Sequence, residues 1–418
     1  MSGYDEVHLR GAPEAVLAVP NLELPEIRAT SPTLAETMRA CLLRAALSKA
    51  SGSSSFVLGS PKAWLGTAYH EVLEKIVEID LSQESLDGAV ERLWDLAIAA
   101  QQQRADAHVL DRRFGSPTTW PAYHVARASV LLRAGELSAA PASAVAPATE
   151  EPRTGLAPTI REQEFTAFGG RLLGRPDVIR ASEVVDYKSG AIVEHDAATL
   201  TNVVKAAYVR QLRIYGYLVK QKLGWWPKRG VLLPLGGAGV EVELEPSECE
   251  REASDAVALL DVYNGKVRSG AAPQEFASPS PESCRWCAYK LVCPAFWQAA
   301  SPDWSGQLDG AAVEGPLVGA PAVIHAGAAR AIAVDVEAGT EARRQAQIAP
   351  LNPSAHPVVA SLAQADRVRL VGVRVRSDGA LGPAQRTVLA RVADLPVITL
   401  ARSAKGVGQA GMRQEPRP

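Results

Sequence analysis

The chain has 418 residues, enough for two or three domains of ordinary size, and 47% of them are hydrophobic. Its formal net charge of -2 argues against a protein that coats nucleic acid through overall positive charge, although a local basic groove would not change that sum. No stretch offers the roughly 18 uninterrupted apolar residues of a membrane span, and the first residues lack the basic and then apolar order of a secretory signal. We therefore expect a globular protein of the cytoplasm.

The first third of the chain predicts helices. They are expected over residues 33–50, 63–79 and 84–105. The first of them, capped by Ser31 or Thr33, places Cys41 at its middle. The second carries His70 on the same face as Leu73, because these residues are three positions apart.

The middle of the chain changes from a linker to strands. Residues 135–158 are rich in Ala, Pro and Ser without any period, which is typical of a flexible connection. The segments IREQEFTAF, GRLLGRPDVIRA and SEVVDYKSG then alternate with period two and predict three sequential antiparallel strands. A helix over residues 203–223, two strands, and a helix from about 247 to 268 are expected to follow.

The hairpin formed by the last two of the three strands holds candidate catalytic side chains. In SEVVDYKSG the side chains of Asp186 and Lys188 share one face, and a short turn would fold Asp177 back beside Asp186. Two neighbouring carboxylates repel unless a cation lies between them, and Mg²⁺ would accept both together with the backbone carbonyl of Tyr187. Such a metal suits phosphodiester hydrolysis, with Lys188 acting on the nucleophile or the transition state. The alternative is a surface hairpin whose acids pair with Lys188 and Arg175.

The order G-R-P-D, eight residues, D-Y-K resembles the PD-(D/E)xK nuclease superfamily, and the flanking helices are similar to its RecB-like branch. LGTAYHEVLEK resembles that branch's N-terminal motif, whose histidine is a metal ligand, here His70. VRQLRIYGY resembles its Q-x3-Y motif and matches Gln211 and Tyr215, which lie one helical turn apart and would position the substrate strand or the attacking water. Glu164 matches an acidic position of the branch, with either direct or water-bridged contact to the metal.

The resemblance implies a restriction-endonuclease-like α/β core, a mixed central sheet flanked by helices, within about residues 31–300. In that core His70, Asp177 and Asp186 would hold Mg²⁺ or Mn²⁺. The implied activity is metal-dependent cleavage of DNA, single-stranded or with free ends, by an exonuclease. No phosphate-binding loop of the G-x4-G-K-[ST] type occurs, so unwinding would need a helicase or other partner subunit.

Three cysteines lie at the spacing of metal ligands. C-R-W-C-A-Y-K-L-V-C places Cys284, Cys287 and Cys293 as C-x2-C-x5-C, and from the spacing alone Zn²⁺ and an iron–sulfur cluster both stay open, as does the fourth ligand. The resemblance to AddB-type and CRISPR-associated RecB-like nucleases implies a [4Fe–4S] cluster with Cys41 as the fourth ligand, leaving Cys249 an ordinary thiol. Aromatic residues beside the cysteines, Trp286 among them, are expected to pack around the cluster rather than to stack on bases.

Short strand-like runs after residue 303 predict a small β-rich domain, for which a barrel is one form. No Phe, Tyr or Trp follows Trp304, so the aromatic stacking platform of a nucleic-acid-binding barrel is missing. Arginines of these strands could still contact phosphates: Arg367, Arg369, Arg374 and Arg376. The expected division of the chain is an N-terminal segment 1–30, a helical part 31–134, a linker 135–158, a nuclease core 159–300, a β-domain 303–402 and a disordered tail 403–418.

Two other functions stay open. One is a catalytically inactive DNA-binding or scaffold subunit of a larger repair or defence complex, which the presence of Asp177, Asp186 and Lys188 argues against. The other is a zinc-stabilised hydrolase of RNA or another phosphodiester.

Overall fold

The computed structural model describes residues 21–76, 79, 84–139, 159–180, 182–188, 190–196, 201–234, 238–377 and 379–401. The α-helices are α1 (Pro32–Ala40), α2 (Leu42–Leu47), α3 (Pro61–Ile76), α4 (Leu86–Ala107), α5 (Tyr123–Ala139), α6 (Ala206–Leu223), α7 (Pro246–Ser269), α8 (Pro281–Arg285) and α9 (Pro294–Ala299). The first ten strands are β1 (Asn21–Leu24), β2 (Ile160–Arg161), β3 (Phe165–Ala167), β4 (Leu172–Gly174), β5 (Val178–Arg180), β6 (Glu183–Lys188), β7 (Val193–Asp196), β8 (Thr201–Val204), β9 (Arg229–Pro234) and β10 (Val240–Glu243). The later strands are β11 (Ala311–Pro316), β12 (Ala322–Ile324), β13 (Ala329–Asp335), β14 (Ala338–Gly339), β15 (Gln345–Leu351), β16 (Arg367–Val375), β17 (Leu381–Arg391) and β18 (Val397–Leu400).

A five-stranded mixed sheet in the order β10-β9-β6-β5-β2 forms the centre of the nuclease part. β6 runs parallel to β9, and the other neighbours are antiparallel. Helix α6 lies on the crossover between the two parallel strands, the connection that such a pair requires. The predicted α/β core with a mixed sheet is therefore confirmed.

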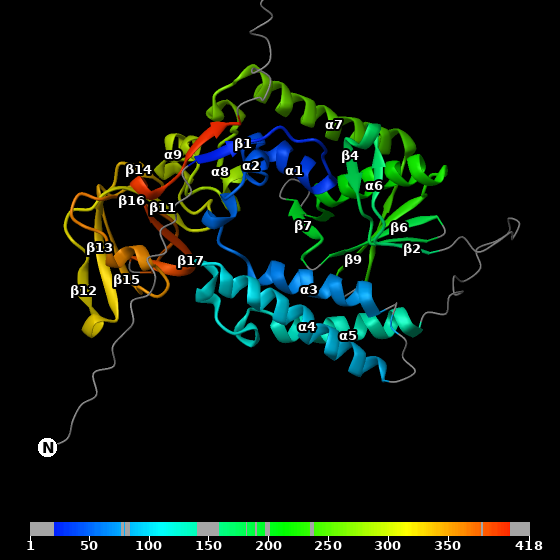
Figure 1. The fold of residues 1–418 in the computed structure, drawn as a ribbon, viewed down its shortest axis with the longest axis horizontal. Helices are drawn as coiled ribbons and strands as arrows, with labels where there is room; N and C mark the ends of the chain where they lie inside the picture. The colour runs from blue at the N-terminus through cyan, green and yellow to red at the C-terminus, as the bar shows by residue number, and fades with distance from the viewer. Residues whose placement is uncertain are drawn as a thin grey trace, which may run out of the picture.

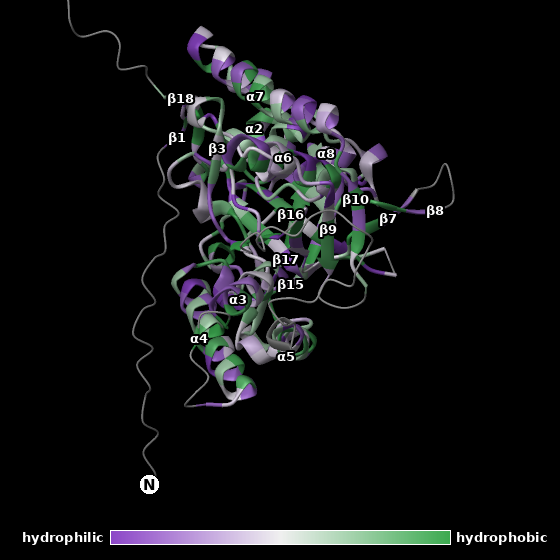
Figure 2. Ribbon diagram, turned by 90° about the vertical axis from the view of Figure 1, so that its right-hand side faces the viewer, coloured by the Kyte–Doolittle hydropathy of each residue, from purple (hydrophilic) through white to green (hydrophobic). Residues whose placement is uncertain are grey.

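Helices cover both faces of this sheet (Figure 1). α3, α4 and α5 pack on one face, where Val185 and Tyr187 of β6 are buried, and α6 and α7 pack on the other, where Val184 is buried. β6 is thus buried on both faces along most of its length, as expected of a central strand with helices on either side of the sheet. In Figure 2 the ribbon of α7 changes between hydrophobic and hydrophilic colour along its length, as expected of a helix with one buried face.

Two of the three strands predicted between residues 160 and 190 are divided in the structure. β2 and β5 join the central sheet, whereas β3 and β4 form a separate hairpin that packs against α6. The division falls near Glu162, whose φ of 48° is left-handed and turns the chain out of the sheet. The hairpin of β7 and β8 was not predicted.

The first predicted helix is broken at Cys41, so the prediction that this residue lies inside a helix is wrong. Ser31 caps α1 by accepting from the Leu34 N–H, and Cys41 adopts an extended backbone with φ -169° between α1 and α2. The Cys41 N–H still donates to the Thr37 carbonyl at 2.9 Å and its own carbonyl accepts from Ala45 N at 3.2 Å. The break therefore redirects one side chain without leaving the backbone unpaired.

The expected linker begins later than residue 135, because α5 continues to Ala139. Its residues 140–158, Val77 of the second predicted helix and the tail 403–418 lie outside the described residues. Within the described part of the chain, no helix combines the length and apolar character needed to cross a membrane.

The C-terminal strands form a seven-stranded sheet in the order β12-β13-β15-β17-β16-β11-β14. This order is open, with β12 and β14 at its edges, so the described strands do not support a closed barrel. Two of the arginines considered for phosphate contact are instead paired within the sheet, since Arg367 and Arg369 both bind the buried carboxylate of Glu314.

The C-terminal strands contact the rest of the chain in several places, among them the hydrogen bond from Arg113 to the Thr387 carbonyl. β18 pairs in parallel with β1, so that Leu22 stands beside Ile398. Cys284 and Leu291 of the cysteine segment also share an apolar cluster with Val371 and Val388 of the C-terminal sheet.

Candidate active site

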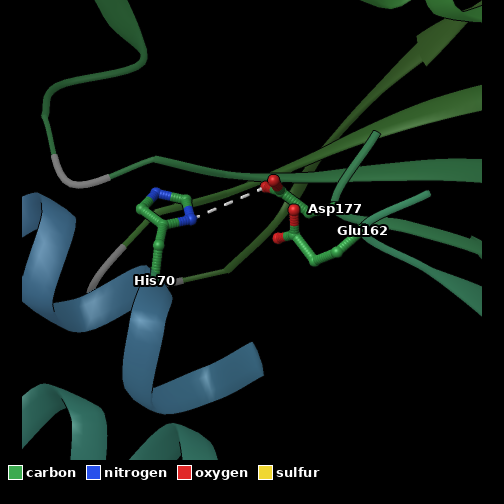
Figure 3. A group of neighbouring side chains, drawn as sticks. All are labelled: His70, Glu162 and Asp177. Atoms are coloured by element: carbon green, nitrogen blue, oxygen red, sulfur yellow. Dashed lines mark ion pairs between the residues drawn. The ribbon is translucent and has the colours of Figure 1, made fainter. Parts of the chain in front are cut away.

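Three side chains from separate elements meet beside the central sheet (Figure 3). His70 projects from α3, Glu162 follows β2, and Asp177 immediately precedes β5. Each offers one ligand atom, and these atoms lie within 4.8 Å of one another; His70 Nδ1 is 4.0 Å from Asp177 Oδ2. An imidazole and two carboxylates are ligands that Mn²⁺ and Mg²⁺ accept.

The antiparallel register of β5 and β6 brings the two aspartates together. Val178 pairs with Val185, so one step further Asp177 stands opposite Asp186. The Tyr187 N–H donates to Asp177 Oδ2 at 2.5 Å and fixes that carboxylate. Because the N–H and C=O of one strand residue point to the same side, the Tyr187 carbonyl is directed toward the same side of β6.

A second group of polar side chains links β6 to α6. The ammonium of Lys188 forms an ion pair with Asp186 and donates to Gln211 Oε1 at 2.8 Å. Gln211 Nε2 donates to Asp186 Oδ1 at 3.3 Å and to the Tyr215 hydroxyl at 3.0 Å. Asp186 is only 3% exposed, and the Lys188 ammonium contacts its Oδ2 while Gln211 contacts its Oδ1.

Burial controls the protonation of these groups. Removal from water raises the pKa of Asp177 and of Asp186. The pKa of Glu162 is also raised, mainly by burial and to a smaller extent by the nearby charge of Asp177. Burial also lowers the pKa of His70, which favours the neutral imidazole that a metal requires. The acids are therefore incompletely neutralised by the protein's own cations.

Glu162 occupies the position that the sequence suggested for Glu164. Glu164 is exposed beside β3, whereas Glu162 is half-buried and bonded through its carboxylate to Arg175, whose Nε lies 2.9 Å from Glu162 Oε2. The same arginine forms an ion pair with Glu74 of α3. The sequence carried a weak signal for Glu162, because two glutamates two positions apart fit the same acidic motif.

A cleft of about 350 Å³ opens onto the site. Its lining residues are Pro32, Thr33, Glu36, His70, Tyr187, Lys188, Gly190, Ala207, Tyr208 and Gln211. The Tyr208 ring, which the sequence did not single out for function, lies 4.7 Å from Lys188 Nζ and 5.7 Å from Lys205 Nζ. The cleft therefore presents an aromatic ring and ammonium groups next to the acids.

The cysteines form a separate site. Four of the five line one small cavity: Cys41, Cys284, Cys287 and Cys293. Cys249 lies apart on α7, buried against Gly216 of α6. Burial raises the pKa of Cys293 to about 12 and also raises the pKa of Cys287, so these thiols stay protonated unless a cation holds them as thiolates.

Comparison with known proteins adds the family. A model described as the PD-(D/E)XK nuclease superfamily matches residues 29–294. No curated protein matches the chain. A solved structure described as "Crystal structure of SSO0001" is similar at 20% identity over 33% of this chain, with a TM-score of 0.20, and the chain spans 60% of that structure's length. The family match covers more than half of the chain and includes the strands and helices of the site. The chain therefore belongs to the PD-(D/E)XK nuclease superfamily.

Proposed function

We propose that the protein is a Mg²⁺- or Mn²⁺-dependent deoxyribonuclease of the RecB-like branch, acting as an exonuclease and carrying a structural [4Fe–4S] cluster. Membership of the superfamily implies a metal-dependent phosphodiester hydrolase. The observation that supports a divalent metal at the active site is the convergence of His70, Glu162 and Asp177 within 4.8 Å, next to a lysine ion-paired with Asp186. The choice of DNA, the RecB-like branch and exonuclease action follow the resemblance of the sequence motifs.

The donor set fits a hard divalent ion. Carboxylate oxygens are the ligands of Mg²⁺, and the added imidazole makes Mn²⁺ a good activator. The raised pKa values of Asp177 and Glu162 indicate unneutralised acids that a divalent cation would stabilise in their charged form. Such an ion, when bound, lowers the pKa of a coordinated water and offsets charge on the phosphate.

The chain's own residues would hold the substrate around that ion. Lys188 lines the cleft and carries the positive charge that would stabilise the crowded phosphate in the transition state. Gln211 accepts from Lys188 and donates to Tyr215, so the ammonium is oriented from α6. His70, neutral through burial, can serve as a ligand without first losing a proton.

The cysteine site supports the cluster. Four sulfurs line one cavity, one from the break between α1 and α2 and three from the segment 284–293. Four cysteine ligands suit either a [4Fe–4S] cluster or a zinc ion, and the resemblance to iron–sulfur nucleases favours the cluster. Zinc stays the alternative, and metal and sulfide analysis after anaerobic purification distinguishes the two.

The activity is tested by incubating end-labelled linear and circular DNA, single- and double-stranded, with wild type and Lys188→Ala in Mg²⁺ or Mn²⁺. We expect wild type to degrade linear DNA only, and Lys188→Ala to be slower by roughly 10²- to 10³-fold. Lys75→Ala is the matched control, because Lys75 is ion-paired with Glu71 on an exposed face of α3. Equal rates for wild type and Lys188→Ala would refute the assignment of the site.

Two further outcomes distinguish the alternatives. Wild type that binds DNA without cleaving it in either metal would favour a scaffold subunit. A parallel RNA substrate that is cleaved faster than DNA would favour a ribonuclease. A helicase or other subunit would be sought with the full-length chain as bait.

A further inference from the structure

Trp286 lies in the loop between two cysteines and is exposed. It follows Cys284 and precedes Cys287, and 53% of its surface is open to solvent. The expectation that it packs around the cysteines is therefore wrong. A tryptophan loses favourable free energy when it stays in water, so an exposed one beside a buried site is a candidate for binding.

Two guanidinium groups lie over the Trp286 ring. Arg285 Cζ is 5.3 Å from the ring centroid, and Arg386 Cζ, from β17, is 5.7 Å away. Arg386 Nε also lies 3.2 Å from Asp309 Oδ2, which orients its side chain. The exposed face at this junction thus combines one aromatic ring with two cations from separate parts of the chain.

A β-bulge places Arg386 there. In the pairing of β16 with β17, Val371 stands opposite Val388 and Val373 opposite Pro383, so residues 384–387 face the single residue Gly372. Gly372 has a φ of 70°, which permits the bend. Such bulges redirect a side chain and are specific features of a sheet.

Thr387 locks the bulge from inside. It is fully buried, donates from Oγ1 to the Gly372 carbonyl at 2.7 Å and accepts from the Ala384 N–H at 2.7 Å. The position of Arg386 is therefore built into the sheet and does not depend on a loosely held surface chain.

We propose that Trp286, Arg285 and Arg386 form a binding site for single-stranded nucleic acid, in which the ring and guanidinium planes stack on bases and the guanidinium groups bind phosphates. The proposal rests on the proposed nuclease function and concerns the path of its substrate. Stacking on aromatic rings with nearby arginines is the usual chemistry of strand binding, and arginine binds phosphate through two parallel hydrogen bonds. No aromatic residue follows Trp304, so the cysteine loop supplies the ring that the C-terminal strands lack.

The test measures binding rather than cleavage. A fluorescein-labelled oligothymidylate of about 20 nucleotides is titrated with full-length protein in a Lys188→Ala background, and anisotropy gives the dissociation constant. We expect Trp286→Ala to weaken binding roughly ten-fold and Trp286→Phe to retain most of it. Arg386→Ala should weaken binding and reduce the slope of log affinity against log salt by about 0.7.

Two matched controls separate the site from general surface effects. Phe168 is an exposed aromatic that stacks on Tyr217, and Arg268 is an exposed arginine that is paired with Glu26 in the loop between β1 and α1. Phe168→Ala and Arg268→Ala should leave the dissociation constant within about two-fold of the background. Iron content and the melting temperature, measured for every variant, report whether the cysteine site and the fold are retained.

If the dissociation constant of Trp286→Ala equals that of the background, this proposal is overturned, and the exposed face would instead suit an acidic protein partner. If wild type still cleaves DNA in that case, the proposed function stands. Wild type that neither binds nor cleaves DNA or RNA would overturn both proposals.

Discussion

At the scale of single residues, the site combines acids that the protein's own cations neutralise only in part. Glu162 shares Arg175 with Glu74. The Asp177 carboxylate accepts the Tyr187 N–H at 2.5 Å, lies 4.0 Å from His70 Nδ1 and interacts with the Glu162 side chain. Lys188 forms its ion pair with Asp186. A divalent ion would therefore stabilise Glu162 and Asp177 more than any present side chain does.

This arrangement predicts that Glu162, and not Glu164, contributes to metal binding. Glu162→Gln keeps the shape and removes the charge, so we expect the Mn²⁺ concentration for half-maximal cleavage to rise roughly 10- to 100-fold. Glu164→Gln is the control, because Glu164 is exposed two positions away. Isothermal titration with Mn²⁺ gives the affinity independently of activity. A larger effect of Glu164→Gln than of Glu162→Gln would reverse the assignment.

At the scale of elements, sequence periodicity predicted the strands and helices that flank the site but not their interruptions. The alternation in β6 and the one-turn spacing of Gln211 and Tyr215 are local, and the structure places Gln211 against Asp186 and Tyr215 against Gln211. The turn at Glu162 depends on a left-handed backbone conformation, which the alternation of apolar and polar residues does not reveal. The break at Cys41 is equally hidden, because Ala, Leu and Arg around it favour a continuous helix.

The break between α1 and α2 predicts a specific role for Cys41. Because it turns this sulfur into the cavity of Cys284, Cys287 and Cys293, we expect Cys41→Ser to lose iron and the visible absorption of a cluster. Cys249→Ser is the matched control, since Cys249 is buried apart from that cavity and should retain both. Anaerobic purification followed by iron and sulfide assay measures the effect. Full iron content in Cys41→Ser would exclude this cysteine as a ligand.

At the scale of the whole molecule, a strand near the start of the described chain pairs with a strand near its end. β1 and β18 pair in parallel, and Leu22 and Ile398 enter a cluster that also holds Tyr263 and Val292. Nothing local in the sequence indicates this pairing, because its residues are more than 370 positions apart and a parallel pair has no connecting turn. The predicted boundaries between a nuclease part and a separate β-domain remain a prediction, and this strand pair makes their independence testable.

If the pair of strands couples the C-terminal sheet to the core, a single substitution in β1 should destabilise both. Leu22 is 0% exposed, so Leu22→Ala should lower the free energy of unfolding by about 2–4 kcal/mol, with one cooperative transition seen by tryptophan fluorescence and by hydrogen exchange of β15, β16 and β17. The two probes report different parts of the chain, because all the tryptophans precede residue 305 and these strands follow it. Val397→Ala, on the partner strand at 62% exposure, should change the free energy of unfolding by less than about 0.5 kcal/mol. Two separate transitions, with only the tryptophan signal shifted by Leu22→Ala, would mean that the C-terminal sheet folds independently of the nuclease core.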